Sequence, residues 1–504
     1  MLRKLGVAAV AALWTLPGVG TGAAQAADGE VTIVLGENVD LVEPCMATRS
    51  NIGRIVLQNI NETLTEFDVK GDKGVMPRLA TSWEETTPGT WRFHLREGVK
   101  FSDGTDFDAT DVQHSFERAM SSQLTCETPR YFGDTKLSYA VVDPHTIDIT
   151  AAPAQPILPL MLSLVTIVPS ETPMEFIREP VGTGPYKLTE WKPGQNIVLS
   201  RRDDYWGDKP AVTKATYEFR TDPAVAAAMV AQGEADLAPS ISAIDATDKT
   251  TDVSYLNSET FYLRIDSGVA PVSDKRVREA MNLAIDRDAF IGTLLPEGVV
   301  KAAALVPPTT LGANPDVQPW PFDPEKAKEL LAAAKADGVP VDTPITLVGR
   351  SNLFPNVLET VEAMAQMLQD VGFTVKVQMM EVAQVEELYN KPYKDGRPPY
   401  ALAVQHDNSR GDPVFTMFFK YDSEGRQSGI SDPKVDELIA KATAATGDER
   451  TKLWQELIAY VHDGVVADVP LFHMVNFARI GKRVSFEPTI ATNSQLQLSD
   501  IAFK

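Results

Sequence analysis

Residues 90–120, TWRFHLREGVKFSDGTDFDATDVQHSFERAM, combine two periodicities in one short stretch. In its first part, apolar Trp91, Phe93 and Leu95 alternate with basic residues, which predicts a strand with one face in water. After a turn-forming Asp-Gly pair, a helix is expected to start near Thr110, because apolar residues then recur at helical spacing. The stretch therefore predicts a compact unit in which a helix covers a sheet.

The same elements recur later in the chain. Residues 322–338, FDPEKAKELLAAAKADG, predict a helix with Asp323 as its N-cap and Gly338 at its end. Residues 358–380, LETVEAMAQMLQDVGFTVKVQMM, predict a helix that Gly372 ends and a strand that follows it. Helix followed by strand, several times over, predicts α/β lobes whose sheets are covered by helices. A chain of 504 residues suits two or three domains, and because no Gly/Ser- or Pro-rich linker separates them, a hinged molecule is expected.

The N-terminus has the features of a secretory signal peptide. Basic residues precede the apolar residues 5–16, and Ala24 and Ala26 fit a small-x-small cleavage site. Residues 1–26 are therefore expected to be removed from an exported, periplasmic protein. The cleavage region has no Cys, which argues against a lipid anchor. No later segment has eighteen consecutive apolar residues, so no insertion into the membrane is expected.

Charge and cysteine content limit the partners and the covalent structure. The net charge is −22 at pH 7, which makes nucleic acid and anionic membranes poor partners and which we interpret as a solubility feature. The two cysteines are Cys45 and Cys126. Export permits a disulfide between them, and the sequence leaves open whether they come close enough to form one.

Residues 405–419, QHDNSRGDPVFTMFF, gather the most suggestive polar side chains. A metal at His406 would need three or four converging ligands, and a hydrolytic pair of Asp407 and Asp412 would use residues that are also common in turns. The sequence has no nucleophile elbow, metalloprotease, Cys-x-x-Cys or phosphate-loop motif. The absence of these motifs weakens the hypothesis of an enzyme, and neither a cofactor nor a metal is expected.

Four stretches resemble one known family. They are MPRLATSWEE (76–85), WRFHLREGVKFSDGTDFDATDVQHSFERA (91–119), PVGTGPYKLTEWKPGQNIVLSRRDDYW (180–206) and DKRVREAMNLAIDRDAFI (274–291). They are similar to the family 5 extracellular solute-binding proteins, the peptide- and nickel-binding receptors of bacterial ABC importers. The resemblance implies an α/β, bilobed, type II periplasmic-binding-protein-like fold with an additional inserted domain. Such a protein closes on a small-molecule ligand, and the permease in the inner membrane recognises the closed state.

The resemblance also implies the domain boundaries. The first lobe would contain residues 27–60, 181–269 and 480–504, with an inserted domain at residues 61–180. The second lobe would contain residues 270–479. Because such a receptor presents both lobes to one permease, a monomer is expected.

The ligand pocket is the next implication. In this family the segment that matches residues 400–419 is a cleft loop of the second lobe, so its polar residues are the candidate ligand contacts: His406, Asp407, Asn408, Ser409 and Asp412. Peptide receptors place an Asp four residues before the Pro of this loop to hold the ligand's amino group, and this chain has Ser409 there. Nickel receptors carry a His just after that Pro, and this chain has Val414. The loop thus departs from both patterns.

Further candidates come from three other segments. Arg350 falls where dipeptide receptors place an arginine that binds the ligand's carboxylate, a task suited to a bidentate guanidinium. Tyr262 and Arg264 replace the family's commoner Asn-ended strand near the hinge, so Arg264 is expected to face the cleft. Thr48 and Asn51 lie in the segment that matches a first-lobe loop touching ligands.

Three hypotheses about function follow. The first is a periplasmic receptor for a small carboxylate-bearing solute, such as a short peptide, an amino-acid conjugate or an opine-like compound. The second is a receptor for a sugar-type or other neutral ligand, which predicts contacts from Trp and Asn side chains. The third, from another class, is a secreted hydrolase that uses Asp407 and Asp412.

Overall fold

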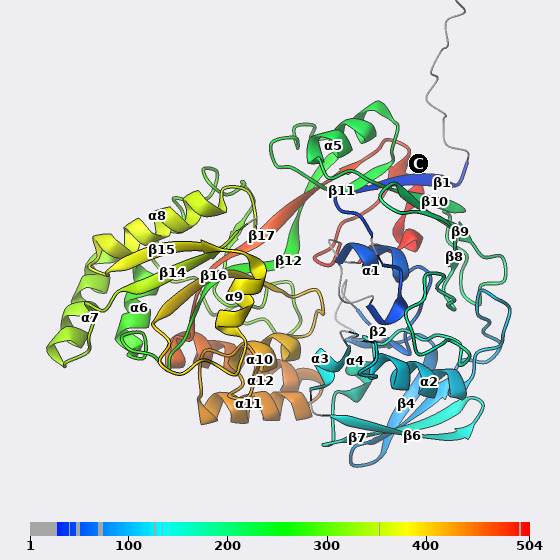
Figure 1. Cartoon of the computed structure of the whole chain (residues 1–504), viewed down its shortest axis with the longest axis horizontal. Coiled ribbons are helices and arrows are strands. Elements are labelled where there is room, and N and C mark those ends of the chain that lie inside the picture. Colours follow the sequence, from blue (N-terminus) through cyan, green and yellow to red (C-terminus); the bar gives the residue numbers. More distant parts are fainter. Residues whose placement is uncertain are drawn as a thin grey trace, which may run out of the picture.

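The structure, a computed structural model, describes residues 28–39, 41–46, 51–68, 74–124, 126, 128–133, 135–351, 353–492 and 495–504. The predicted signal peptide and the candidate ligand residue Thr48 lie outside this set. Two lobes lie side by side, and long strands join them (Figure 1). Each lobe combines helices with part of one sheet, as the repeated helix-strand pattern predicted.

One mixed sheet of eleven strands runs through both lobes. Its strands are β1 (Glu30–Leu35), β8 (Tyr186–Lys192), β9 (Asn196–Arg201), β10 (Lys214–Phe219), β11 (Leu237–Ile241), β12 (Asp252–Ile265), β13 (Val300–Lys301), β14 (Ile345–Arg350), β15 (Val375–Met380), β16 (Tyr400–Asp407) and β17 (Asp468–Ile480). The order is β15-β14-β16-β12-β17-β11-β1-β10-β9-β8, and β13 pairs with β17 off this path. The second lobe holds the β15 end of this order, and the first lobe holds the β8 end.

Strands β12 and β17 pass from one lobe to the other as antiparallel neighbours. At one end Asp252 of β12 is opposite Arg479 of β17, and at the other Arg264 is opposite Asp468. Phe261, together with the two other apolar residues on its face of β12, packs in the core of the second lobe. The boundary at residue 269 stays a prediction, and β12, which precedes it, contributes residues to both lobes.

The first lobe is assembled from three separate parts of the chain. Its core draws on residues 31–60, 186–237 and 480–501. The other elements here are η1 (Pro44–Met46), α1 (Asn51–Leu57), α5 (Pro223–Gln232), β18 (Val484–Ser485), η3 (Leu498–Asp500) and β19 (Ala502–Phe503). The C-terminal segment thus returns to the lobe in which the described chain begins.

The inserted domain has a sheet and a core of its own. Its four antiparallel strands lie in the order β4 (Ala80–Thr87), β5 (Thr90–Leu95), β7 (Thr146–Ala152) and β6 (Lys136–Asp143). Beside them are β2 (Thr65–Phe67), β3 (Val75–Pro77), α2 (Ala109–Ala119), α3 (Thr128–Phe132) and α4 (Leu158–Leu162). Strand β5 is the one predicted from alternation, with Phe93 and Leu95 buried. Helix α2 begins with a capping box between Asp108 and Asp111.

The second lobe covers both faces of its part of the sheet with helices. These are α6 (Lys275–Ala284), α7 (Pro324–Ala336), α8 (Val357–Asp370), α9 (Val382–Tyr389), α10 (Pro413–Tyr421), α11 (Pro433–Ala444), α12 (Gly447–Ala459) and the short π-helix η2 (Tyr460–Val465). Helix α7 starts as predicted, since the Asp323 side chain accepts from the Lys326 backbone N–H at 2.9 Å. Successive strand residues such as Leu347 and Val348 point to opposite faces of the sheet and belong to different cores.

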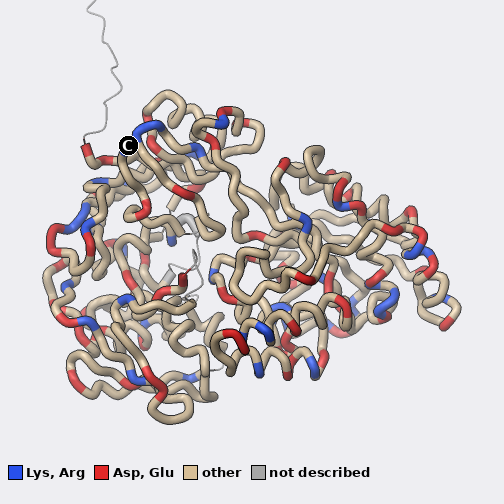
Figure 2. Tube along the Cα trace, turned by 180° about the vertical axis from the view of Figure 1, so that it is seen from behind, with Lys and Arg blue, Asp and Glu red and all other residues tan. Residues whose placement is uncertain are grey.

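Cys45 and Cys126 form a disulfide, with their Cα atoms 5.3 Å apart. The bond joins the segment that precedes α1 to the inserted domain, which resolves the possibility that the sequence left open. Figure 2 shows acidic residues spread over both lobes and interspersed with basic ones. No helix in the described part of the chain has the length and apolar composition needed to cross a bilayer.

Candidate functional site

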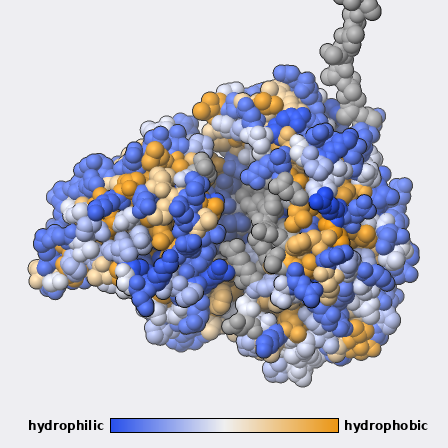
Figure 3. Space-filling view, viewed as in Figure 1, coloured by the Kyte–Doolittle hydropathy of each residue, from blue (hydrophilic) through white to orange (hydrophobic). Residues whose placement is uncertain are grey.

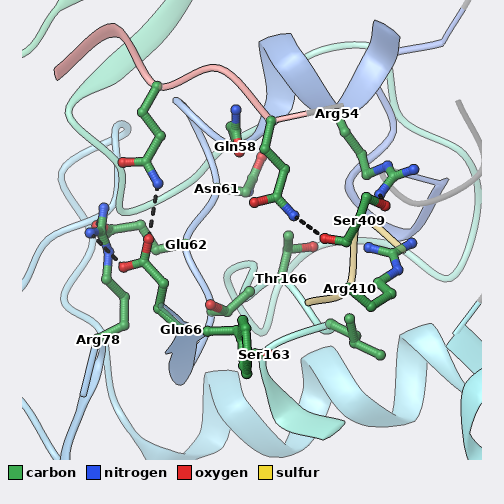
Figure 4. Close-up of a pocket in the computed structure, with 15 residues that line it drawn as sticks. Arg54, Gln58, Asn61, Glu62, Glu66, Arg78, Ser163, Thr166, Ser409 and Arg410 are labelled. Carbon is green, nitrogen blue, oxygen red and sulfur yellow. Dashed lines mark hydrogen bonds and ion pairs between the residues drawn. The ribbon is translucent and has the colours of Figure 1, made fainter. Parts of the chain in front are cut away.

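A cavity lies where the two lobes and the inserted domain meet. Its open space amounts to about 860 Å³, and Figure 3 shows the molecular surface hollowed between the lobes. The second lobe contributes Ser409 and Arg410 to the lining, helix α1 contributes Arg54, and the turn after that helix contributes Gln58. The remaining lining residues are Asn61, Glu62, Thr63, Glu66, Phe67, Arg78, Ser163, Leu164, Thr166, Gln495 and Gln497 (Figure 4). Because both lobes line it, this cavity is the candidate ligand site.

The second-lobe wall is a tight loop that follows β16. The Ser409 backbone N–H and hydroxyl both donate to the Asp407 carboxylate, at 2.8 Å each. Gly411 has a φ of +75°, and a Cβ atom at this position would overlap the ring of Phe67. Glycine therefore permits both the turn and the close approach of the inserted domain, and Ser409 and Arg410 are held at the cavity.

Arg54 joins the first lobe to this loop. Its Nη1 donates to the Ser409 hydroxyl at 3.4 Å, and its Nη2 lies 3.9 Å from an Asp407 carboxylate oxygen. Near the C-terminus, the Gln495 side chain donates to the Ser409 carbonyl oxygen at 3.3 Å. Two segments of the first lobe thus hold one short loop of the second.

Tyr131 of α3 joins the inserted domain to the same loop. Its hydroxyl accepts from Arg410 Nη2 at 2.9 Å, and the guanidinium carbon lies 4.8 Å from the ring centroid. The ring also packs against Phe415 and Phe419 of α10, with centroids 6.0 and 6.4 Å away. We call Tyr131, Arg410, Phe415 and Phe419 the aromatic clasp. It is a contact between domains that closure must form and opening must break.

The opposite wall of the cavity carries acidic side chains around a single arginine. Arg78 Nη2 lies 2.7 Å from Glu62 Oε1, and Arg78 Nη1 lies 3.2 Å from Glu66 Oε2. Glu62 also accepts from the Tyr205 hydroxyl at 2.9 Å and from the Trp206 indole N–H at 2.8 Å. Glu62 therefore binds three side chains, those of Arg78, Tyr205 and Trp206, whereas the only one of these that Glu66 contacts is Arg78.

Two carboxyl groups, Glu259 and Asp407, lie opposite each other in the β12–β16 register. Burial and the charge of Asp407 raise the pKa of Glu259 to about 8, against the opposing charge of Arg350. For Asp407, burial acts upward, but the charge of Arg54 and a hydrogen bond from Ser258 hold the pKa below its usual value. At neutral pH the pair thus carries one negative charge, on Asp407.

Asp412 does not lie where the sequence suggested. Its carboxylate caps α10 by accepting from the Val414 backbone N–H at 2.9 Å and binds Arg450 through two contacts of 2.9 Å. It is absent from the described lining of the cavity. The expectation of a ligand contact is therefore corrected, because both oxygens of Asp412 are used inside the second lobe.

Asn408 and His406 connect the loop that carries Ser409 to neighbouring parts of the chain. The Asn408 side chain donates to the carbonyl oxygens of Ser258 and Leu305, each at 3.1 Å. The Thr416 hydroxyl donates to Asn408 Oδ1 at 3.0 Å and lies 2.8 Å from His406 Nε2. Neither side chain is part of the described lining, so a direct contact of His406 or Asn408 with the ligand stays a prediction.

Tyr262 and Arg264 lie inside the second lobe. Tyr262 is completely buried in the apolar core. Arg264 is 2% exposed and donates to the Tyr393 hydroxyl and to the Ser428 carbonyl oxygen. The expectation that Arg264 faces the cleft is wrong, because residues two apart on a strand share a face and this face of β12 packs against the second lobe's own residues.

The remaining candidate residues, Arg350, Asn51, Ser409 and Asp407, differ in how close they lie to the cavity. Arg350 ends β14 beside Glu259, but it is not part of the described lining, and its buried Nε has no hydrogen-bond partner in the described part of the chain. Asn51 begins α1. Of the predicted contacts, Ser409 lines the cavity, with Asp407 hydrogen-bonded directly behind it.

Several lining residues escaped the sequence reasoning. Arg54 meets Ser409 across 355 positions of sequence, so no local pattern could pair them. Arg78 lies inside MPRLATSWEE, a stretch that had served only as a sign of family resemblance. Glu66 carries no motif. Among the described residues, no group of His, Cys, Asp and Glu is arranged to hold a metal ion.

Comparison with known proteins gives a family match over most of the chain. The model described as "Bacterial extracellular solute-binding proteins, family 5 Middle" matches residues 74–426. The dipeptide-binding protein of Escherichia coli (strain K12) is 29% identical over 84% of this chain and 85% of that protein. The nickel-binding periplasmic protein of the same strain is 27% identical over 88% of each. The match runs through all four stretches that predicted the resemblance.

A solved structure shows the same fold. The periplasmic binding protein DppA from Helicobacter pylori in complex with peptide STSA, described as ABC transporter-associated, has a TM-score of 0.75. The similarity covers 94% of this chain and 98% of that one, at 22% identity. The predicted α/β, bilobed type II fold is thereby confirmed.

Proposed function

This chain belongs to family 5 of the bacterial extracellular solute-binding proteins, and on that basis we propose that its ligand is a small carboxylate-bearing solute, with a short peptide as the first candidate. Family 5 proteins bind small ligands and deliver them to an ABC permease. The chain is accordingly a substrate-binding protein of an ABC importer. Its ligand is trapped between the lobes and released at the permease.

The cavity shared by the two lobes carries the proposal. Ser409 and Arg410 come from the second lobe, and Arg54 and Gln58 come from the first. A ligand that touches both walls binds the closed state more tightly than the open state, so it shifts the population toward closure.

Arginines near the loop supply the binding partner for a carboxylate. Arg54 and Arg410 line the cavity, and Arg350 lies close behind Asp407 and Glu259. In the proposal, Arg54 and Arg410 contact the ligand's carboxylate, and Arg350 adds a third positive charge near it. Guanidinium groups suit this task because they offer paired donors to a desolvated carboxylate.

A neutral ligand is the second candidate. The amides of Gln58, Asn61, Gln495 and Gln497 line the cavity, and amides are suitable partners for sugar hydroxyls. That hypothesis also predicted Trp contacts, and the described lining contains no Trp. The carboxylate ligand is therefore preferred.

A hydrolase is not supported by the position of the two aspartates. Asp412 binds Arg450 and caps α10, while Asp407 faces Arg54 and Ser409. The family and the similar proteins are binding proteins. In the proposal, export depends on residues 1–26 acting as a signal peptide, and the receptor meets the permease as a monomer.

The proposal is tested first by mass spectrometry of the protein isolated from its own periplasm. Native and denaturing spectra are compared, and the expected result is an extra mass of roughly a few hundred daltons that is lost on denaturation. A carboxylate-bearing molecule of that mass supports the proposal. A sugar supports the second candidate, and an ion-sized increment contradicts both.

A further inference from the structure

The disulfide between Cys45 and Cys126 lies at the start of the helix that supplies the aromatic clasp. Cys126 closely precedes α3, and Tyr131 is on α3. Through Tyr131 this helix contacts Arg410 and Phe415 of the second lobe, and Figure 1 shows α3 at the boundary between the lobes, beside α10. The position of α3 therefore decides whether the clasp can form.

Cys45 is a firmly held attachment point. Its neighbour Glu43 is buried and forms an ion pair with Arg118 of α2, with two contacts of 2.6 and 3.1 Å. The same carboxylate accepts from the backbone N–H of Cys45 at 3.0 Å and from that of Ile177 at 2.7 Å. Because hydrogen bonds to a charged carboxylate are strong, these contacts fix the segment around Cys45 to the inserted domain without help from the disulfide.

The two ends of α3 are anchored in different ways. At the end of the helix, Phe132 is buried in the core of the inserted domain. Before the start of the helix, Cys126 packs with Cys45 in a small apolar cluster that is separate from the larger cores. Thr128, at the start, lines a small cavity together with Cys45 and Arg118, so the packing there is incomplete. The disulfide is thus the covalent anchor for the less tightly packed end of α3.

We propose that the Cys45–Cys126 disulfide is a positioning element for closure: it fixes the start of α3, so that Tyr131 is held where it can join the second lobe. The disulfide and the clasp then stabilise each other, because a coupling free energy between two contacts is reciprocal. Breaking the disulfide weakens the clasp, and breaking the clasp makes the disulfide easier to reduce. This inference concerns closure and does not depend on which ligand is bound.

A disulfide that only stabilises the fold would behave differently. The bond closes a loop across 81 positions of sequence, and such a bond stabilises the folded chain mainly by restricting the unfolded chain. That effect does not involve contacts with α10 of the second lobe. A substitution on α10 therefore separates the two roles, because it leaves both cysteines and α3 unchanged.

The first test measures how readily the disulfide is reduced in the full mature chain. The protein is equilibrated with mixtures of reduced and oxidised dithiothreitol. The reduced reagent gives up two electrons and two protons to form its cyclic disulfide, and the two cysteines become thiols. Alkylation and mass spectrometry then report the reduced fraction.

Phe415→Ala removes a ring of the clasp from α10, and it should lower the ratio of reduced to oxidised reagent at the midpoint by about fivefold or more. Phe418→Ala is the matched control, since Phe418 lies on the same helix, is 46% exposed and is not part of the clasp. The control should leave the midpoint unchanged. An unchanged midpoint in Phe415→Ala, or an equal shift in the two variants, overturns the proposal.

The second test removes the disulfide and follows closure by small-angle X-ray scattering without ligand. Cys45→Ala/Cys126→Ala should increase the radius of gyration, and it should cause no further increase when Tyr131→Ala is already present, because both changes release the same clasp. A folded double-alanine variant with the wild-type radius, or with an increase that adds fully to that of Tyr131→Ala, contradicts the inference.

The two tests do not depend on each other. If Cys45→Ala/Cys126→Ala does not fold, the reduction of the disulfide-containing proteins still decides. Neither measurement uses the ligand, so a failure of this inference leaves the proposed function intact, and a failure of the proposed function leaves these two measurements valid.

Discussion

Glu259 and Asp407 have the same functional group and opposite pKa shifts. Burial beside another carboxyl raises the pKa of Glu259 to about 8, while Arg54 helps to hold that of Asp407 down. A single strand pairing brings them together, since the two residues are opposite each other on β12 and β16. The pair therefore places a proton and a negative charge behind the candidate site at neutral pH.

This arrangement predicts a pH dependence of stability. In the unfolded chain Glu259 loses its proton near pH 4.5, but in the folded protein it does so only near pH 8. Folding therefore loses stability as pH rises between these values. Glu259→Gln should remove a cost of at most about 4.5 kcal/mol at pH 8.5, the value for a shift from 4.5 to about 8, and should change little at pH 4. Thermal unfolding at both pH values, with Glu84→Gln as control, checks this. An equal effect of Glu259→Gln at the two values would contradict it.

Two arginines near the loop, Arg410 and Arg350, should differ in their effect on binding. Arg410→Gln removes a guanidinium that lines the cavity and should weaken binding of the identified ligand by roughly 2 kcal/mol. Arg350→Ala should have a smaller effect, because Arg350 lies outside the described lining. Calorimetric titration of each variant is the measurement. Unchanged affinity in Arg350→Ala would show that Arg350 does not bind the ligand's carboxylate. Unchanged affinity in Arg410→Gln would show that this wall of the cavity does not contact the ligand.

Helix α10 depends on a residue that resembled a site residue in the sequence. Asp412 caps the helix N-terminus, and Pro413 stands at its first position. Arg450, on α12, binds the same carboxylate at 2.9 Å. The Gly-Asp-Pro sequence is therefore the start of a helix and a link between two helices. The carboxylate of Asp412 therefore stabilises the second lobe.

Substitution of Asp412 should accordingly affect stability and spare binding. Asp412→Ala removes the cap and leaves Arg450 without its carboxylate, which should cost about 3 kcal/mol. Asp412→Asn keeps a cap acceptor and should cost less. Unfolding temperature and ligand affinity are measured together for both variants. A loss of affinity in a fully folded Asp412→Asn protein would show that Asp412 contributes to ligand binding.

Closure of the whole molecule depends on contacts made by one short loop. Ser409 and Arg410 meet the first lobe through Arg54 and Gln495, and the inserted domain through Tyr131. Strands β12 and β17 form the continuous connection between the lobes. The clasp and the cavity share Arg410, so a ligand that binds Arg410 also favours the closed state.

Removal of the clasp should open the ligand-free protein. Tyr131→Ala deletes the ring that packs on Phe415 and Phe419 and the hydroxyl that binds Arg410. The radius of gyration in small-angle X-ray scattering should increase relative to wild type. Ligand affinity should fall by roughly tenfold, because binding must then supply the closure energy. Tyr131→Phe keeps the ring and should lie between the two. A radius of gyration unchanged in Tyr131→Ala would show that the clasp does not hold the lobes.

Local sequence determined the elements and, through family-specific stretches, the fold. Alternation predicted β5, and the apolar period with its caps predicted α2 and α7, because strand and helix periodicity are properties of neighbouring residues. The four stretches quoted above predicted the family that the comparison confirms. Ser409 was also predicted at the pocket, through the same resemblance.

Tertiary structure alone decided which charged residues line the cavity. Asp412 and Arg264 looked available in the sequence, but Arg450 and Tyr393 engage them inside the second lobe. Glu66 and Arg54, which carried no motif, face the cavity because distant chain segments pack there. A side chain's role depends on the partners that folding brings to it, and those partners lie between 38 positions away, as for Asp412 and Arg450, and 355 positions away, as for Ser409 and Arg54.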